Sequence, residues 1–243
     1  MSGPSGVIAP RPPTPSAGVA LPGALRLVVV DAGHGGQDPG TSHFGLQEKS
    51  LNLDIARRLR GQLEQTGLQV VMTRDTDAFI PLSGRPGVAN QLNAGLFVSL
   101  HINANRNQRV SGAEVYYPRE TTPPPTSRWP PGVQASEVGV PSVAVKHLLW
   151  DLVLGRRRAE SRRLAGSVCG ALREGLQVHC RVKSARFVVL RETRMPAVLV
   201  EVGYVSNPVE SQRLGQPSYR DAAARAVAQG VVSYLRAAYN QQI

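Results

Sequence analysis

Four side chains of types suited to metal-dependent hydrolysis occur where the sequence predicts strands to end or a helix to begin. His34 lies in the glycine-rich stretch VVVDAGHGGQDPG, and Glu48 opens a predicted helix. His101 is near the end of the apolar stretch GLFVSLHIN, and Glu201 interrupts the apolar stretch AVLVEVGY. Functional groups of open α/β sheets gather at the carboxyl ends of the strands, so we expect these four residues to lie together.

Two histidines and one carboxylate form a ligand set that is typical of zinc hydrolases, which leave a further position open for water. His34, Glu48 and His101 are therefore the predicted metal ligands. Each of them alone has a plainer interpretation, because single histidines are usually structural and a glutamate at a helix start usually interacts with the helix dipole. Their shared position at one sheet edge favours the metal site.

Glu201 is predicted to be the general base or acid beside the metal. A carboxylate in a buried strand is costly unless it is paired, protonated or linked to a metal. The structural alternative is an internal salt bridge to an arginine. The sequence allows two roles for Asp31. It could orient a metal-bound histidine, or it could cap the loop backbone.

The glycines around His34 also raise the alternative of a phosphate-binding loop. Their order, Gly33, Gly35, Gly36 and Gly40, matches neither the dinucleotide fingerprint nor the P-loop, and no Lys-Ser or Lys-Thr follows. We therefore reject nucleotide binding. Glycines here would instead let the backbone pass close to a metal and a substrate.

Strands and helices are predicted to alternate along the chain. Helix 48–66 shows leucine or isoleucine every four residues and is expected to end at Gly67. The other predicted helices are 81–94, 145–176 and 219–239, and the predicted strands are 25–32, 68–74, 95–103, 112–117, 186–190 and 197–204. This order predicts one α/β domain with a twisted, mostly parallel central sheet of about six strands, flanked by helices on both faces.

Two segments have the composition of irregular structure. Residues 1–24 hold six prolines and show no apolar period, so we expect a disordered lead or linker before a domain at 25–243. Residues 118–142 hold seven prolines, which predicts an irregular insert at about 118–145.

The formal net charge of +11 predicts contact with an anionic surface, such as nucleic acid, acidic lipid or a cell-wall polymer. Cys169 and Cys180 could form a single bridge or remain two buried thiols. No stretch is long enough to span a membrane, and residues 1–24 lack the apolar run of a signal peptide.

Five stretches in this order resemble the zinc-dependent N-acetylmuramoyl-L-alanine amidases of the bacterial AmiA/AmiB/AmiC type. They are VVVDAGHGGQDPG, LQEKSLNLDIARRL, VVMTRDTD, RPGVANQLNAGLFVSLHINA and VLVEVGYVSNPVES. The resemblance covers residues 26–240 apart from the insert. Each stretch alone is weak, whereas the five together at sensible spacing are specific.

The resemblance implies that His34, Glu48 and His101 bind one Zn²⁺ and that Glu201 is the catalytic carboxylate. It implies cleavage of the amide between the lactyl group of N-acetylmuramic acid and the L-alanine that begins the stem peptide of peptidoglycan. An exported enzyme of the periplasm or cell envelope is expected, with the signal peptide absent from these residues and a monomer favoured.

Some members of this family carry a segment after the fourth strand that covers the site until a protein activator displaces it. Residues 118–160 occupy the corresponding place, and Glu137 or Glu160 would be the residue that reaches the metal. The alternative is a disordered or substrate-guiding loop, which is favoured because this stretch does not closely resemble the family's regulatory helix.

Three other functions are compatible with parts of the sequence. A zinc carboxypeptidase acting on stem peptides would release single amino acids, and a non-catalytic cell-wall-binding module would bind sacculi without dissolving them. Nucleic-acid binding would rest on RRRAESRR at 156–163, which has no interleaved aromatics and fits a solvated helix face better.

Overall fold

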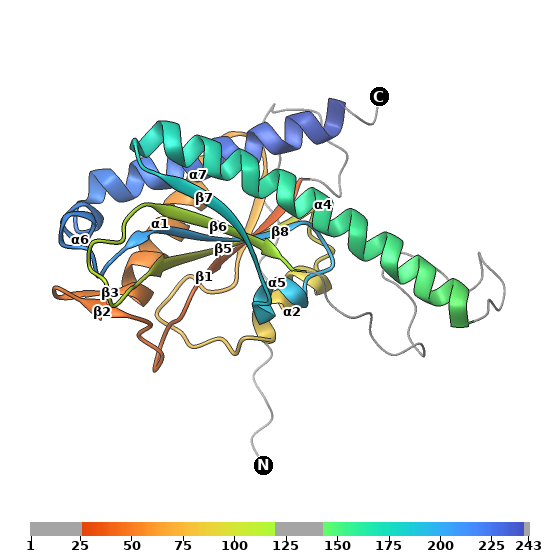
Figure 1. The fold of residues 1–243 in the computed structure, drawn as a ribbon, viewed down its shortest axis with the longest axis horizontal. Coiled ribbons are helices and arrows are strands. Elements are labelled where there is room, and N and C mark those ends of the chain that lie inside the picture. The colour runs from red at the N-terminus through yellow and green to blue at the C-terminus, as the bar shows by residue number, and fades with distance from the viewer. Residues whose placement is uncertain (1–25, 120–142, 241–243) are drawn as a thin grey trace, which may run out of the picture.

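The computed structural model describes residues 26–119 and 143–240, in which six strands form one sheet (Figure 1). The spatial order is β4-β1-β5-β8-β6-β7. The bounds are β1 Leu27–Ala32, β4 Gln69–Met72, β5 Leu96–Asn103, β6 Ala113–Pro118, β7 Cys180–Ala185 and β8 Ala197–Tyr204. β4, β1, β5 and β8 are parallel, whereas β6 is antiparallel to β8 and parallel to β7. The predicted mostly parallel sheet is confirmed.

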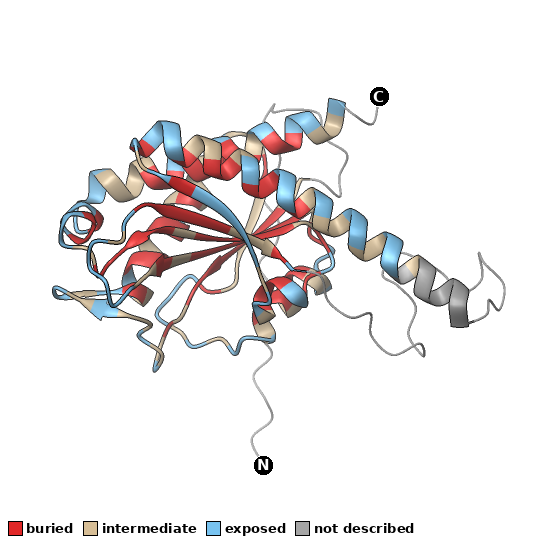
Figure 2. Ribbon diagram, viewed as in Figure 1, coloured by how far each residue is buried: buried red, intermediate tan, exposed pale blue. Residues whose placement is uncertain are grey.

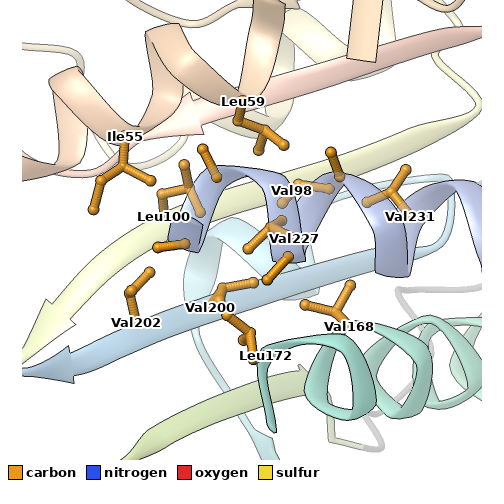
Figure 3. Packing of buried hydrophobic residues seen from close by; sticks show 14 of the residues in the cluster. Ile55, Leu59, Val98, Leu100, Val168, Leu172, Val200, Val202, Val227 and Val231 are labelled. Atoms are coloured by element: carbon orange, nitrogen blue, oxygen red, sulfur yellow. The ribbon is translucent and has the colours of Figure 1, made fainter. Parts of the chain in front are cut away.

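Three long helices cover one face of this sheet. They are α1 (Glu48–Gln65), α4 (Val143–Leu176) and α7 (Pro217–Asn240), and α4 and α7 lie side by side over the strands in Figure 1. Their buried side chains meet those of the strands, as Figure 3 shows for Leu59, Leu100 and Val200. Most of the apolar core lies on this face, which gives the sheet a rigid support.

The opposite face has a smaller cover, formed by the short helices α2 (Gly84–Gln91) and α5 (Val188–Arg191) (Figure 1). Their residues pack against Val29, Phe97 and Leu199. Further toward the carboxyl ends of β5 and β8, the same face carries His101 and Glu201. The candidate site therefore begins where the apolar cover of this face ends.

The predicted helix 48–66 is confirmed as α1. Leu51, Ile55, Leu59 and Leu63 are all buried, as their spacing predicted. Figure 2 shows that the central strands of the sheet are mostly in the colour of buried residues. The helix ends at Gln65, and Gly67 follows with φ of +86°, a conformation that glycine adopts readily.

The predicted strand at 186–190 is wrong. Residues 188–191 form the helix α5, and Val189 and Leu190 pack under the sheet. The strand of this region is β7, which lies at the edge of the sheet, pairs with β6 and exposes four of its six residues. Its polar sequence CRVKSA lacks the apolar run of a buried strand, because an edge strand has little to bury.

Helix α6 (Pro208–Leu214) was also missed. Asn207 caps it by accepting hydrogen bonds from the amides of Val209 and Glu210, and Pro208 occupies the first turn. The order Asn-Pro was a readable helix-start signal.

Cys169 of α4 and Cys180 of β7 form a disulfide, which settles the alternative that the sequence left open. The bridge joins the edge strand to the helix that covers the far face of the sheet.

The predicted disordered lead, most of the proline-rich insert and Glu137 lie outside the described residues, so the domain boundaries stay predictions. Within the described parts of the chain, every helix is either too short or too polar to cross a bilayer.

Candidate metal centre

His34 lies in the tight loop that follows β1. The chain turns sharply here, because φ is +60° at His34 and +130° at Gly35. The backbones of Gly35 and Asp38 form two hydrogen bonds with each other. A Cβ on Gly33 would lie 2.3 Å from the imidazole of His101, so this position has room only for glycine. The absence of a side chain at Gly33 therefore allows the imidazole of His101 to lie against the backbone next to His34.

Glu48 is the first residue of α1, directly after the hairpin of β2 (Ser42–His43) and β3 (Leu46–Gln47). Its Oε1 is 2.9 Å from His101 Nδ1 and 3.2 Å from His34 Nε2. Its Oε2 accepts a hydrogen bond from the amide of Thr41 at 2.9 Å. Burial alone would raise the pKa of Glu48, but its hydrogen bonds with the two histidines lower it well below its usual range. Glu48 is therefore a buried, ionised carboxylate.

His34, Glu48 and His101 can direct one ligand atom each to a common point. These atoms lie within 4.8 Å of one another, and no other such group of three occurs among the side chains that the structure describes. The predicted ligands are thus brought together from a loop, a helix start and a strand. Two imidazole nitrogens and one carboxylate oxygen fit a divalent transition metal with a position left open.

Asp38 orients the imidazole of His34 and was not identified from the sequence. Its Oδ2 is 2.7 Å from His34 Nδ1, which leaves Nε2 directed toward Glu48. Burial lowers the pKa of His34, but Glu48 and Asp38 outweigh burial and raise it to about 8. A carboxylate on the outer nitrogen of a ligating histidine fixes its tautomer and increases its basicity. The readable signal was an acid four residues after the histidine, inside the same loop.

We expect Asp38→Asn to weaken metal binding by about 10- to 100-fold, because the ring of His34 loses its fixed tautomer. Competition of zinc with a chromophoric chelator measures this affinity. Asp77→Asn is the matched control, since Asp77 supports the same loop through Gly36 and Lys49 without touching His34. Equal affinities in Asp38→Asn and the control would contradict the orienting role.

Glu201 lies on β8 directly beside His101 of β5, as the strand register shows. Its Oε2 is buried and has no hydrogen-bond partner among the described residues. Burial is the main reason why the pKa of Glu201 rises to about 7, and the charges of Glu48 and Glu114 add to the rise. No described arginine forms a salt bridge with it, so the structural alternative is not what the structure shows. A bound dication would lower this pKa and favour the carboxylate.

Asp31 contacts neither histidine. It is fully buried and binds Arg85 at 2.8 Å, Thr73 at 2.7 Å and Ser99 at 2.7 Å. The same Arg85 donates to the carbonyl of His34 at 2.9 Å. Asp31 therefore supports the His34 loop through a buried arginine, a role that neither of its predicted alternatives describes.

Arg74 adds a second buried support that the sequence did not indicate. Its guanidinium donates to the carbonyls of Ala32, Gly33 and Lys49. The end of β1 is thereby linked to the first turn of α1, so the residues flanking His34 and Glu48 share one rigid network.

Glu160 does not act as a metal plug in this structure. It accepts a hydrogen bond from the hydroxyl of Tyr234 at 2.9 Å and pairs with Arg163, so it joins α4 to α7 on the far face of the sheet. Its fixed partners correct the prediction that it reaches the metal.

Comparison with known proteins agrees with the resemblance carried by the five sequence stretches. A sequence profile of the N-acetylmuramoyl-L-alanine amidases, Amidase_3, matches residues 28–233. AmiC of Neisseria meningitidis is 36% identical over 91% of this chain and 56% of its own length. LytC of Bacillus subtilis is 34% identical over 87% of this chain and 36% of its own length. AmiA of Escherichia coli is 34% identical over 90% of this chain and 80% of its own length.

Solved structures share the fold. AmiC2 of Nostoc punctiforme aligns with a TM-score of 0.69 and 33% identity, over 88% of this chain and 98% of that one. An N-acetylmuramoyl-L-alanine amidase of Clostridium difficile aligns with a TM-score of 0.69 and 31% identity, over 88% and 98% of the two chains. The chain thus spans only about half or less of the AmiC and LytC relatives but nearly all of these structures. It belongs to the Amidase_3 family of N-acetylmuramoyl-L-alanine amidases.

Proposed function

We propose that the chain is a zinc-dependent peptidoglycan amidase. It hydrolyses the amide between the lactyl group of N-acetylmuramic acid and the first L-alanine of the stem peptide, in wall remodelling or daughter-cell separation. The observation that carries the proposal is the position of Glu201 beside the three converging ligand atoms, with a buried Oε2 that has no hydrogen-bond partner among the described residues. Membership of the amidase family supports the reaction class.

The donor set suits zinc, which binds two histidines and one glutamate in several hydrolases and keeps a fourth position open. A zinc ion held by His34, Glu48 and His101 would supply a Lewis acid that activates water and polarises the amide carbonyl. The side chains of His34 and His101 are 25% and 18% exposed, so the ligand group is reachable from solvent.

Glu201 is the residue that moves the proton. Its carboxylate takes the proton from the attacking water and delivers it to the departing amine of L-alanine. Because no described residue donates a hydrogen bond to Oε2, its lone pairs can accept that proton. Glu48 cannot serve as the base, because both of its oxygens already accept hydrogen bonds.

The basic charge fits this substrate. A protein of formal charge +11 is attracted to the anionic polymers of the cell wall. We accordingly place the protein in the cell envelope, and the predicted activator-controlled segment stays a prediction because residues 120–142 lie outside the described part.

The product of sacculus digestion tests the proposal. The amidase should release intact stem peptides with a free L-alanine amine, which mass spectrometry and amine labelling identify. Protein kept metal-free with a chelator is the control and should release nothing. Release of single amino acids would show the carboxypeptidase instead, and binding to sacculi without soluble product would show the binding module.

A further inference from the structure

The side chains beside the metal centre continue in a row across the sheet. Strand register places His101 opposite Glu201, Glu201 opposite Glu114, and Glu114 opposite Arg181. Directly paired residues project from the same face of a sheet. The row therefore leads from the metal ligands, past the proton carrier, to the exposed edge strand β7.

Glu114 is the buried centre of this row. Its Oε2 accepts a hydrogen bond from the hydroxyl of Tyr116 at 2.5 Å, and its Oε1 accepts one from Lys183 Nζ at 2.6 Å. Burial alone would raise the pKa of Glu114, but Lys183 and Tyr116 outweigh burial and lower it. Glu114 is thus an ionised carboxylate with both oxygens already in use.

Arg181 is a second cation on this one carboxylate. Its guanidinium is 3.4 Å from the Oε1 that Lys183 already occupies. The side chains of Arg181 and Lys183 are 58% and 42% exposed, whereas that of Glu114 is 2% exposed. Neutralising Glu114 needs only one cation, so the pair presents about one excess positive charge to solvent.

An aromatic surface lies next to these two cations. The rings of Tyr116 and Phe187 meet edge to face at 5.2 Å, and Lys183 Nζ lies 5.8 Å from the centre of the Tyr116 ring. Phe187 is 39% exposed. A cationic pair beside a partly exposed aromatic ring can hold an anionic group attached to an apolar or peptide backbone.

The spacing suits a substrate group close to the reacting bond. Arg181 is two strands from Glu201, a backbone separation of roughly 10 Å. An extended peptide covers about 3.3–3.6 Å per residue, so the head of Arg181 lies within reach of the first few residues of the peptide being released. In peptidoglycan the free carboxylates belong to the peptide and not to the scissile sugar–peptide link.

We propose that Arg181 and Lys183 form a subsite that binds a free carboxylate of the stem peptide on the leaving-amine side of Glu201. Glu114 and Tyr116 are positioning residues. Glu114 pairs with both cations, and the ring of Tyr116 lies next to Lys183. The inference rests on the proposed amidase function and adds to it a preference for substrates whose second residue is D-glutamate over those with its amide, D-isoglutamine.

The test compares two muropeptides that differ only in this carboxylate, one with D-glutamate and one with D-isoglutamine. For the zinc-loaded enzyme, we expect Arg181→Gln to lower kcat/KM about tenfold on the acid and less than about twofold on the amide, as for the loss of one charge-assisted hydrogen bond. Arg181→Lys should restore part of the preference. Arg225→Gln is the matched control, because Arg225 is 50% exposed and pairs with Asp221 on α7.

The binding of both muropeptides to zinc-loaded Glu201→Gln protein, measured by calorimetry, gives a second readout that does not depend on turnover. Adding Arg181→Gln to this protein should abolish its preference for the acid. Equal losses on both muropeptides, or no loss on either, would show that Arg181 and Lys183 only neutralise Glu114 and would overturn the subsite. The wild type could also bind the acid more tightly than the amide and yet cleave neither muropeptide. That result would contradict the amidase function and leave the carboxylate subsite supported.

Discussion

Glu201→Gln should lower the rate of amide hydrolysis by about 10²- to 10⁴-fold while the protein still binds its metal ion. Glutamine has nearly the same shape as glutamate but cannot accept the proton of the attacking water at neutral pH. Glu201 is not among the converging ligand atoms, so zinc content should stay near that of the wild type. Release of stem peptides from sacculi, together with metal analysis of the same samples, measures both effects. Full activity in the variant would overturn the mechanism.

The stability of this variant provides its control. In the metal-free protein, burial raises the pKa of Glu201 to about 7, above the roughly 4.3 of an exposed glutamate. Between pH values near these two pKa values, Glu201 is ionised in the unfolded chain but still protonated in the folded protein. The free energy of unfolding of the wild type therefore falls as pH rises through this interval. Metal-free Glu201→Gln should therefore match the Tm of the wild type below about pH 4 and exceed it above about pH 7. A lower Tm at every pH would mean that misfolding explains the lost activity.

His34→Ala should abolish both stoichiometric metal binding and hydrolysis. The variant removes one of three converging ligands, and the remaining Glu48 and His101 cannot complete a site of three protein ligands. We expect zinc content to fall from about one per chain to a small fraction of that, with activity reduced to the background of the assay. Dialysis against a chelator followed by metal analysis and sacculus digestion measures both.

Zinc re-addition distinguishes loss of the metal from loss of the fold. Chelated wild type should regain activity on addition of zinc, whereas His34→Ala should not. His43→Ala is the matched control, because His43 lies in the hairpin before Glu48 but outside the ligand group. Normal zinc content in His34→Ala would remove this residue from the proposed site.

Much of the site could be predicted because its residues interrupt regular patterns. His101 and Glu201 are polar positions in otherwise apolar strands, and His34 follows a run of valines. Such patterns report burial and strand ends, and parallel strands bring their ends to one edge. Glu48 joined them because it opens the helix that begins at the same sheet edge, although its local sequence alone would suggest only a helix start.

The supporting residues of the site could not be predicted in the same way. Arg85 meets Asp31 across 54 positions of the chain, and Arg74 reaches Gly33 across 41. No local period encodes such pairs, since each is defined only when a particular loop folds against a particular strand end. Asp38 differs from them, because its position in the His34 loop was visible and its role was not.

The edge strand β7 could not be predicted from the sequence either. β7 is largely exposed and contains two basic residues, so its sequence resembles a loop more than a strand. It is a strand because β6 offers it a free edge, and the bridge between Cys169 and Cys180 ties it to α4. The proposed carboxylate subsite is formed by residues of this strand, so it could not be predicted from the sequence alone.

The sequence by itself determined the α/β class, the main buried elements and the four candidate chemical residues, because hydrophobic periodicity and strand ends are local properties of the chain. The tertiary structure alone decided that Asp38 orients His34 and that Asp31 acts through Arg85. It also decided that one oxygen of Glu201 has no hydrogen-bond partner in the described part of the chain. It also placed Arg181 and Lys183 in the row that continues from Glu201. These features depend on hydrogen bonds and charge interactions between segments that are distant along the chain. The energy of such an interaction depends on the distance between the two groups in space and not on their separation in the sequence.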